Sequence, residues 1–131
     1  MIVVDTSVWI DLLNGSDTPK ANRCAEMIED GAPIALTDVV LTEILQGFRT
    51  DREASSVETS LRRFPILRLQ SVDDFVIAAR LYRIARRAGI TIHKTIDCLI
   101  AAACVRAGAP LFHDDKDFDR LASCTDLEVF A

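Results

Sequence analysis

Residues 1–11 read MIVVDTSVWID, and this stretch decides the class of fold. The short β-branched apolar run at 1–5 is typical of a strand that is buried on both faces. Asp5, Thr6 and Ser7 then offer a helix N-cap, after which apolar residues continue at helical spacing. A buried strand that runs directly into a helix is the unit of a parallel sheet, in which helices form the crossovers.

The same alternation continues along the chain. Further short strands are predicted at residues 33–36, 65–69, 111–113 and 127–130. Helices are predicted at residues 6–13, 19–29, 37–47, 51–63, 71–89, from 95 or 97 to 108, and 115–121. We therefore expect an α/β fold with a parallel sheet covered on both faces, in which ligands bind beyond the carboxyl ends of the strands.

Composition limits the class of protein. The 131 residues are 50% hydrophobic and 27% charged, which indicates one domain spanning 1–131 with its own core and excludes disorder. No apolar run approaches the roughly 20 residues of a membrane span, and the N-terminus lacks the basic start of a signal peptide. We therefore expect a cytoplasmic protein.

The cysteines do not predict a metal site or a disulfide framework. Cys24, Cys98, Cys104 and Cys124 form no CxxC pair, and the two histidines lie twenty residues apart. Zinc sites use closer ligand pairs, and a chain with this much core needs no disulfides. We expect reduced, buried and inert thiols.

Charge is unevenly distributed along the chain. The net charge is −5, yet residues 80–95 contain five basic side chains and no acid. Such segregation either marks a solvated helix face or provides a contact surface for an anionic partner.

Four acids stand at or near the ends of predicted elements, where a side chain can point into a cleft. Asp5 follows the first strand, Glu43 lies in the helix at 37–47, Asp97 begins the most apolar helix, and Asp115 follows the strand at 111–113. Structural interpretations stand beside this one: helix caps for Asp5 and Asp97, an exposed position for Glu43, and a solvated helix N-terminus for Asp115. If the four converge, a cation must offset their repulsion, and an all-oxygen set selects Mg²⁺ or Mn²⁺.

Three stretches carry a resemblance to a known family: IVVDTSVWIDLL at 2–13, LTDVVLTEILQG at 36–47 and IDCLIAAACVRAGAPLFHDDKDF at 96–118. The chain resembles the PIN-domain ribonucleases, and within them the VapC-type toxins of bacterial type II toxin–antitoxin systems. The resemblance runs from end to end. It implies a PIN-like three-layer α/β/α sandwich with a short-stranded, mainly parallel central sheet.

The resemblance also implies roles for individual residues. The catalytic and metal-binding acids would be Asp5, Glu43, Asp97 and Asp115, with Asp117 as an auxiliary metal ligand and Thr6 and Ser7 as auxiliary residues beside Asp5. Two departures are visible: His113 stands where many relatives have threonine, and Asp114 adds a charge. Which of Asp114, Asp115 and Asp117 contacts metal therefore stays open.

A ribonuclease with an acidic active site needs positive charge nearby to hold the RNA backbone. The predicted RNA-binding residues are Arg80, Arg83, Arg86, Arg87 and Lys94. Trp9 and Tyr82 could each serve as a base-stacking platform, but we expect both in the core or in an interface.

The resemblance implies a Mg²⁺-dependent endoribonuclease toxin, with Mn²⁺ as an alternative ion and tRNA as the substrate suggested by analogy. Its partners would be a VapB-type antitoxin and a second copy of the chain, in a homodimer and a toxin–antitoxin hetero-oligomer. The expected antitoxin groove is lined by Val8, Trp9, Leu12, Ile44 and Phe48. The alternative function is a non-catalytic PIN-like module that binds RNA or protein. A receiver domain or an aspartate-nucleophile phosphatase is excluded, because neither paired acids nor a D-x-D motif follows the first strand.

Overall fold

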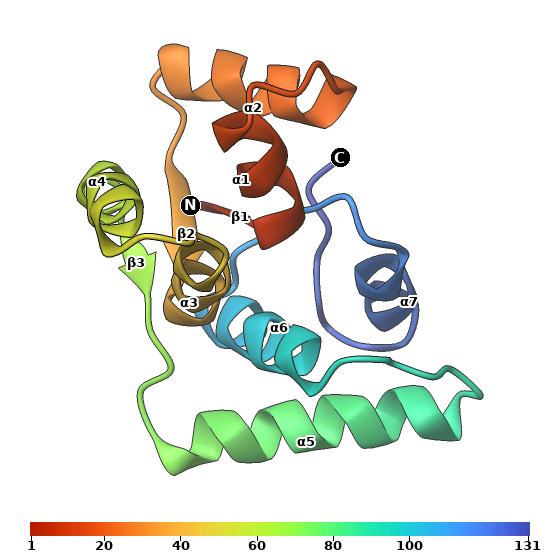
Figure 1. Ribbon diagram of the computed structural model, residues 1–131. Helices are drawn as coiled ribbons and strands as arrows, with labels where there is room; N and C mark the ends of the chain where they lie inside the picture. The colour runs from red at the N-terminus through yellow and green to blue at the C-terminus, as the bar shows by residue number, and fades with distance from the viewer.

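Four short strands form one sheet at the centre of the computed structural model, which describes all 131 residues (Figure 1). They are β1 (Ile2–Val4), β2 (Ile34–Thr37), β3 (Ile66–Leu67) and β4 (Leu111–Phe112). Their order is β3-β2-β1-β4, and every pairing is parallel. Val3 of β1 is in register with Ala35 on one side and Leu111 on the other.

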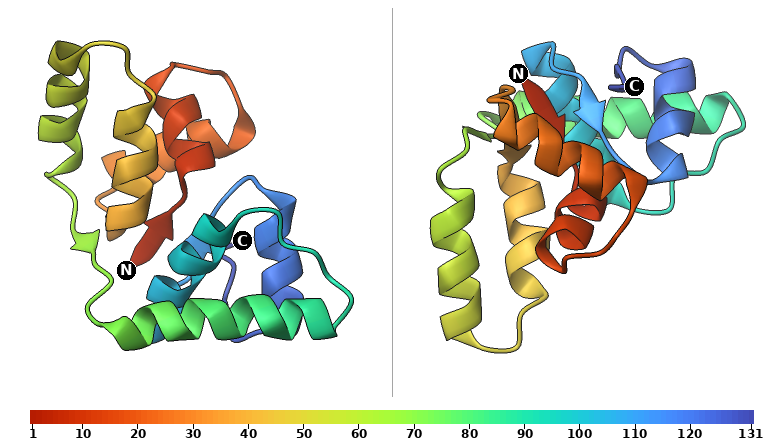
Figure 2. Two further views of the ribbon diagram at one scale, coloured as in Figure 1. Left: turned by 60° about the horizontal axis from the view of Figure 1, so that its bottom comes forward. Right: turned by 90° about the horizontal axis from the view of Figure 1, so that it is seen from above.

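Helices cover both faces of this sheet. They are α1 (Thr6–Leu13), α2 (Pro19–Glu29), α3 (Asp38–Gln46), α4 (Asp51–Leu61), α5 (Val72–Arg87), α6 (Thr95–Ala107) and α7 (Lys116–Cys124). Helices α1 and α2 lie on one side, and α6, backed by α5, lies on the other (Figures 1 and 2). The α/β class and the three layers predicted from the sequence are confirmed.

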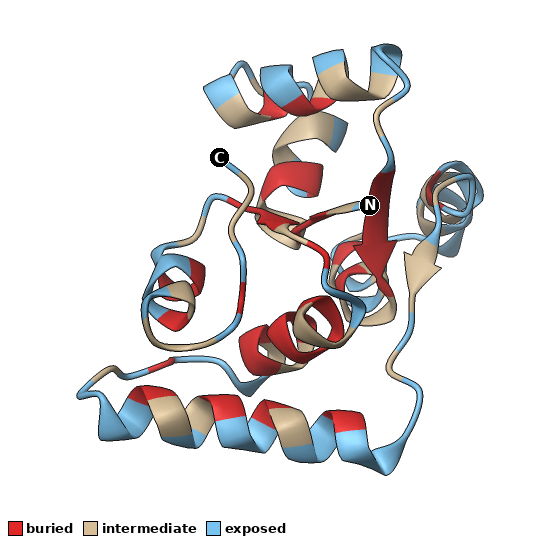
Figure 3. Ribbon diagram, turned by 180° about the vertical axis from the view of Figure 1, so that it is seen from behind, coloured by how far each residue is buried: buried red, intermediate tan, exposed pale blue.

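Burial follows the apolar patterns of the two central helices. In α6 a nearly continuous apolar run is buried between the sheet and α5, from Ile100 through Cys104. Helix α5 instead buries one face, through Ala78, Leu81 and Ala85, and leaves the opposite face exposed (Figure 3). A stripe of this kind is what apolar residues at helical spacing produce.

Two expectations need correction. The strand predicted at 127–130 is reduced to a single bridge between Val129 and Leu111, because the two-residue β4 offers so short an edge. Two backbone hydrogen bonds of 2.9 Å still hold this tail, from the Leu111 N–H to the Glu128 carbonyl and from the Phe130 N–H to the Leu111 carbonyl. The Phe130 ring adds side-chain contacts, since it lies 5.9 Å from the Phe112 ring and 5.2 Å from the Arg23 guanidinium. All four cysteines are free, as expected, but Cys124 is only half-buried.

The order of the strands reverses beside β1. The chain proceeds outward from β1 to β2 and β3, then returns through α5 and α6 to place β4 on the other side of β1. Such a reversal leaves a crevice beyond the carboxyl ends of the two strands, where α/β proteins bind ligands. None of the seven helices has the length and apolarity that crossing a membrane requires.

Candidate active site

A pocket of about 290 Å³ opens at this crevice, and all four predicted acids line it. Its lining residues are Asp5, Thr6, Ser7, Ile10, Glu43, Gln46, Lys94, Asp97 and Asp115. They come from α1, α3, the start of α6 and the turn after β4. The fold therefore brings together acids that lie up to 110 positions apart in the sequence.

Asp5 leaves the end of β1 with its backbone still bonded to the neighbouring strand, because its N–H donates to the carbonyl of Phe112 at 2.9 Å. Its Oδ2 accepts from the Ser7 N–H at 3.2 Å and from the Ser7 hydroxyl at 2.7 Å. Asp5 is thus the N-cap of α1 and a pocket acid at once. Burial raises its pKa, although the bonds from Ser7 oppose the shift.

Thr6 and Ser7 connect this turn to two other elements of the site. The Thr6 hydroxyl donates to Glu43 Oε1 at 2.7 Å, which fixes the carboxylate of α3 beside α1. The Ser7 hydroxyl also accepts from the backbone N–H of Asp114 at 3.1 Å. One hydroxyl therefore links the carboxyl ends of β1 and β4.

Asp97 is the acid least satisfied by the protein. It is 5% exposed in the first turn of α6, and its Oδ2 is buried with no hydrogen-bond partner. The N-cap of α6 is Lys94, so the capping interpretation of Asp97 is wrong. Burial, followed by the negative charges of Asp115 and Asp5, raises the pKa of Asp97 to about 7.

A buried histidine holds Asp115 in place. Asp115 is the N-cap of α7, and its own N–H donates to Nδ1 of His113 at 3.0 Å. Burial lowers the pKa of His113, so we assign a neutral ring with its proton on Nε2, which lies 3.2 Å from Asp119 Oδ1. The Lys20 ammonium donates to the His113 carbonyl. In the sequence, His113 stood out only as a departure from the family pattern. No local pattern shows that its ring accepts a hydrogen bond from the backbone of Asp115.

Asp117 lies beside the pocket but does not line it. Its Oδ1 accepts from Arg120 at 2.7 Å, and its Oδ2 lies 3.2 Å from Nδ1 of His93. Burial alone would raise the pKa of Asp117, but the hydrogen bonds from Arg120 and His93 lower it. Its role as a metal ligand stays a prediction.

Of the five predicted RNA-binding residues one lies at the catalytic pocket, and all five are exposed. Lys94 lines the pocket itself, and the four arginines are exposed on α5. None of the five forms a salt bridge with an acid of the chain. Contact with RNA stays a prediction, but these positive charges are not neutralised by carboxylates of the chain.

The donor set of the pocket fits a hard divalent cation. Carboxylates dominate it, and the buried Asp97 Oδ2 has no donor. No three acid, histidine or cysteine side chains are spaced closely enough to form a preassembled metal cluster. Such spacing agrees with mutual repulsion among like charges.

Comparison with known proteins identifies this arrangement, since residues 2–123 match the family model described as PIN domain. The chain belongs to the PIN-domain family. This PIN domain is 37% identical over 130 residues to "VapC ribonuclease Mb1587" of Mycobacterium bovis and to "Ribonuclease VapC11" of Mycobacterium tuberculosis. Each match covers 98% of this chain and 97% of the relative. The VapC-type resemblance seen in the sequence is thereby confirmed.

Solved structures share the fold of this PIN domain at low sequence identity. VapBC2 from Rickettsia felis, bound to a DNA fragment from its promoter, has a TM-score of 0.76 at 19% identity, covering 99% of this chain and 98% of that chain. FitAcB from Neisseria gonorrhoeae has a TM-score of 0.74 at 20% identity, covering 100% and 97%. At these identities the likeness is one of fold.

Proposed function

We propose that this PIN-domain protein is a Mg²⁺-dependent endoribonuclease and the toxin of a toxin–antitoxin pair. One observation carries the proposal: Asp5, Glu43, Asp97 and Asp115 surround one pocket, and a buried oxygen of Asp97 has no partner within the protein. The ribonuclease names of relatives at 37% identity support the reaction class.

Asp5 and Asp97 would hold the cation, with Glu43 and Asp115 completing the carboxylate set and Asp117 in an auxiliary role. When bound, Mg²⁺, or alternatively Mn²⁺, lowers the pKa of a water molecule and offsets charge on the phosphoryl oxygens. We assign Mg²⁺ on the hardness of the donors, because no histidine or cysteine lines the pocket.

The remaining residues would orient the acids and the substrate. Ser7 and Thr6 fix the carboxylates of Asp5 and Glu43, and His113 fixes the turn that bears Asp115. Lys94 supplies the positive charge next to the pocket and would attract a phosphate group. Burial raises the pKa of the nearby Cys98 thiol to about 11, so no thiolate nucleophile is present. Direct attack of water on phosphorus with departure of the 3′ oxygen would leave a 5′ phosphate and a 3′ hydroxyl.

The test is RNA cleavage by the purified protein, freed of any antitoxin, in Mg²⁺, in Mn²⁺ and in EDTA. Total RNA, tRNA and ribosomal RNA serve as substrates, and tRNA is the one we propose by analogy. We expect cleavage with either metal, none in EDTA, and none by Asp97→Asn. Cleavage that persists in EDTA would overturn the metal mechanism, whereas RNA binding without cleavage in Mg²⁺ would favour the non-catalytic module.

An apolar groove beside the catalytic pocket supports the antitoxin proposal and corrects its expected lining. Val8 and Trp9 are 1% and 2% exposed, and Trp9 packs on Phe64, so neither reaches a partner. The groove is lined by Ile10, Leu13, Asn14, Ile44, Gly47 and Phe48, and it shares Ile10 with the catalytic pocket. An apolar helix of the antitoxin would fill this groove and extend an arginine into the acidic pocket.

Self-association is proposed on a different surface. Val72, Phe75 and Val76 at the start of α5 are 77%, 51% and 49% exposed. Three large apolar side chains within five positions are typical of an interface, so a homodimer through α5 is proposed.

A further inference from the structure

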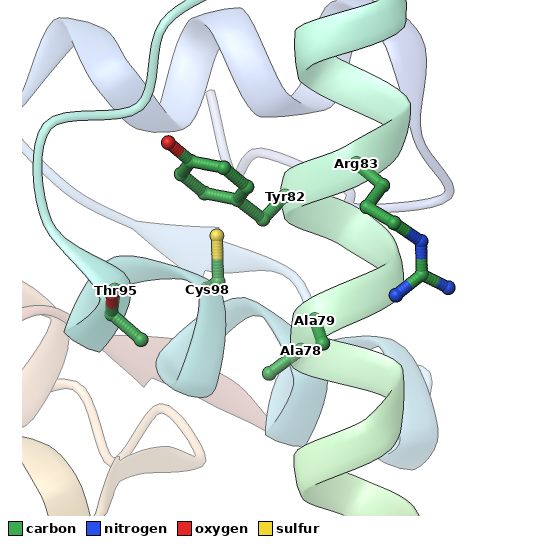
Figure 4. Close-up of a pocket in the computed structure, with 6 residues that line it drawn as sticks. All are labelled: Ala78, Ala79, Tyr82, Arg83, Thr95 and Cys98. Atoms are coloured by element: carbon green, nitrogen blue, oxygen red, sulfur yellow. The ribbon is translucent and has the colours of Figure 1, made fainter.

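A second pocket, of about 310 Å³, lies between α5 and the first turn of α6 (Figure 4). It is lined by Ala78, Ala79, Tyr82, Arg83, Thr95 and Cys98. The catalytic pocket uses the alternate positions of the same helical turn, Lys94 and Asp97. Thr95 and Cys98 each follow a residue of the catalytic pocket by one position. The two pockets therefore open on adjacent sides of the same helical turn.

The lining of this second pocket combines a small apolar base with an aromatic ring. The pocket is open because the side chains of Ala78 and Ala79 are small. The Tyr82 ring extends from α5 toward the side on which Cys98 and Thr95 lie (Figure 4). The Arg86 guanidinium lies over the Tyr82 ring at 5.7 Å from its centroid, which stabilises the ring in this orientation. Tyr82 is thus half-buried: it packs against the edge of the core and forms one wall of this pocket.

The charge around the second pocket favours an anionic ligand. Arg83, the arginine that lines the pocket, makes no ion pair with any acid of the chain. Its side chain points away from Tyr82, toward the opposite side of α5 (Figure 4). Lys94 lines the catalytic pocket and is the N-cap of α6, directly before Thr95 of the second pocket, and no side chain caps that helix end. Free backbone N–H groups beside an ammonium group offer a place for a phosphate.

We propose that this second pocket is a nucleobase subsite, in which an unpaired base of a single-stranded RNA stacks on Tyr82. The phosphate of that nucleotide would lie at Lys94, next to the catalytic pocket. The inference rests on the proposed ribonuclease function and adds to it the position of a substrate base. RNA is favoured over a protein partner because residues 80–95 carry five basic side chains and no acid, in a chain whose net charge is −5.

The test is equilibrium binding of a short single-stranded oligoribonucleotide in EDTA, where no cleavage interferes. Tyr82→Leu removes the ring and should weaken binding about ten-fold or more, the loss typical of one base–aromatic stack. Tyr82→Phe keeps the ring and should bind like the wild type. Phe130→Leu is the matched control, because Phe130 is also a half-buried aromatic residue with a guanidinium over its ring, and it lies outside this pocket.

Two further arms separate a subsite from a general structural effect. Ala79→Leu fills the pocket from an exposed helix position without altering Tyr82, and should weaken binding in the same way. In the second arm, an abasic nucleotide replaces each nucleotide of the RNA in turn. One of these replacements should weaken binding to the wild type and leave binding to Tyr82→Leu unchanged.

Equal affinities of the wild type and Tyr82→Leu, or abasic losses of the same size in both, would overturn the subsite. The two proposals can also fail separately. If binding of one base depends on Tyr82 but the RNA is not cleaved in Mg²⁺, the subsite is retained and the ribonuclease proposal is overturned. Cleavage with no dependence on Tyr82 would do the reverse.

Discussion

At the scale of single residues, the acids of the pocket oppose folding. Asp97 is buried among three other carboxylates, and burial together with their charge raises its pKa from 3.8 to about 7. Acids in such surroundings are retained where they serve binding or catalysis, since an apolar or amide side chain there would stabilise the fold better.

The first prediction concerns the pH dependence of stability in EDTA. Because the folded-state pKa of Asp97 lies above its unfolded value, its favourable contribution is fully present below pH 4 and is lost as the pH rises through about 7. Asp97→Asn should therefore raise the free energy of unfolding at pH 8 by about 2 kcal/mol, after discounting for solvent at the pocket mouth, and change it little at pH 4.

Urea unfolding at both pH values measures this effect. Asp126→Asn, an exposed acid outside the catalytic pocket, is the control and should leave the pH profile unchanged. A profile for Asp97→Asn that coincides with the wild type at every pH would contradict the prediction.

The second prediction concerns His113, a positioning residue that acts through the backbone of Asp115. His113→Ala removes the acceptor of that N–H and should lower kcat for RNA cleavage about 10- to 100-fold, the loss usual for groups that orient metal ligands. His113→Asn restores an acceptor oxygen near the same place and should recover part of kcat. If both variants unfold alike in urea but Asn recovers nothing, the hydrogen bond to Asp115 is not what His113 contributes.

At the scale of elements, α5 and α6 have different roles: α6 supports the site from the core, and α5 offers an exposed basic face to a substrate. Helix α6 is buried along most of its length and presents polar groups at its first turn and, through Arg106, at its last turn, where Arg106 is paired with Asp74. Helix α5 buries one face, and the arginines of its second half remain exposed and without salt bridges. These free charges, together with Lys94, are expected to contribute to the salt dependence of RNA binding.

The third prediction follows from this exposed arginine face. Arg87→Glu should weaken single-stranded RNA binding and reduce the slope of log K against log salt by about 0.7, the value for one lost phosphate contact. Arg52→Glu on α4, an exposed arginine distant in sequence from the basic segment, is the matched control. Equal slopes for the wild type and Arg87→Glu would leave this residue as solvated surface.

At the scale of the whole molecule, the order of the strands assembles two neighbouring functional surfaces. The reversal beside β1 places the acidic pocket at the carboxyl ends of β1 and β4. Helix α1, which follows β1, borders that pocket and also forms one wall of the apolar groove. A partner seated in the groove can therefore reach the acids without a change in the fold.

The fourth prediction tests the groove with the partner present. Leu13→Asp places a charge in the groove at a side chain that is already 40% exposed, so the fold should tolerate it while antitoxin binding is lost. Co-purification with the product of the neighbouring gene measures this loss. Ala88→Asp alters an exposed apolar residue outside the groove and outside the proposed dimer surface, and should retain the antitoxin; retention by both variants would exclude the groove.

The sequence by itself determined the local features of this protein. The β-branched run before Asp5 and the apolar run after Asp97 predict a buried strand and a buried helix, because backbone propensity and side-chain periodicity are local properties. The four pocket acids and the basic segment were identified in the same way, from their places beside strand ends and on a helix.

Only the tertiary structure decided which distant segments meet. The Ser7 hydroxyl bonds the backbone of Asp114, 107 positions away, because β1 and β4 are neighbours, and no local pattern encodes strand order. The groove uses Ile10 and Leu13 and not Val8 and Trp9, because packing against Phe64 and the core selects the face of α1 that is buried. Tyr82 lines a pocket for a related reason: its neighbours across the gap are small, and the space that side chains leave between two helices depends on both of them.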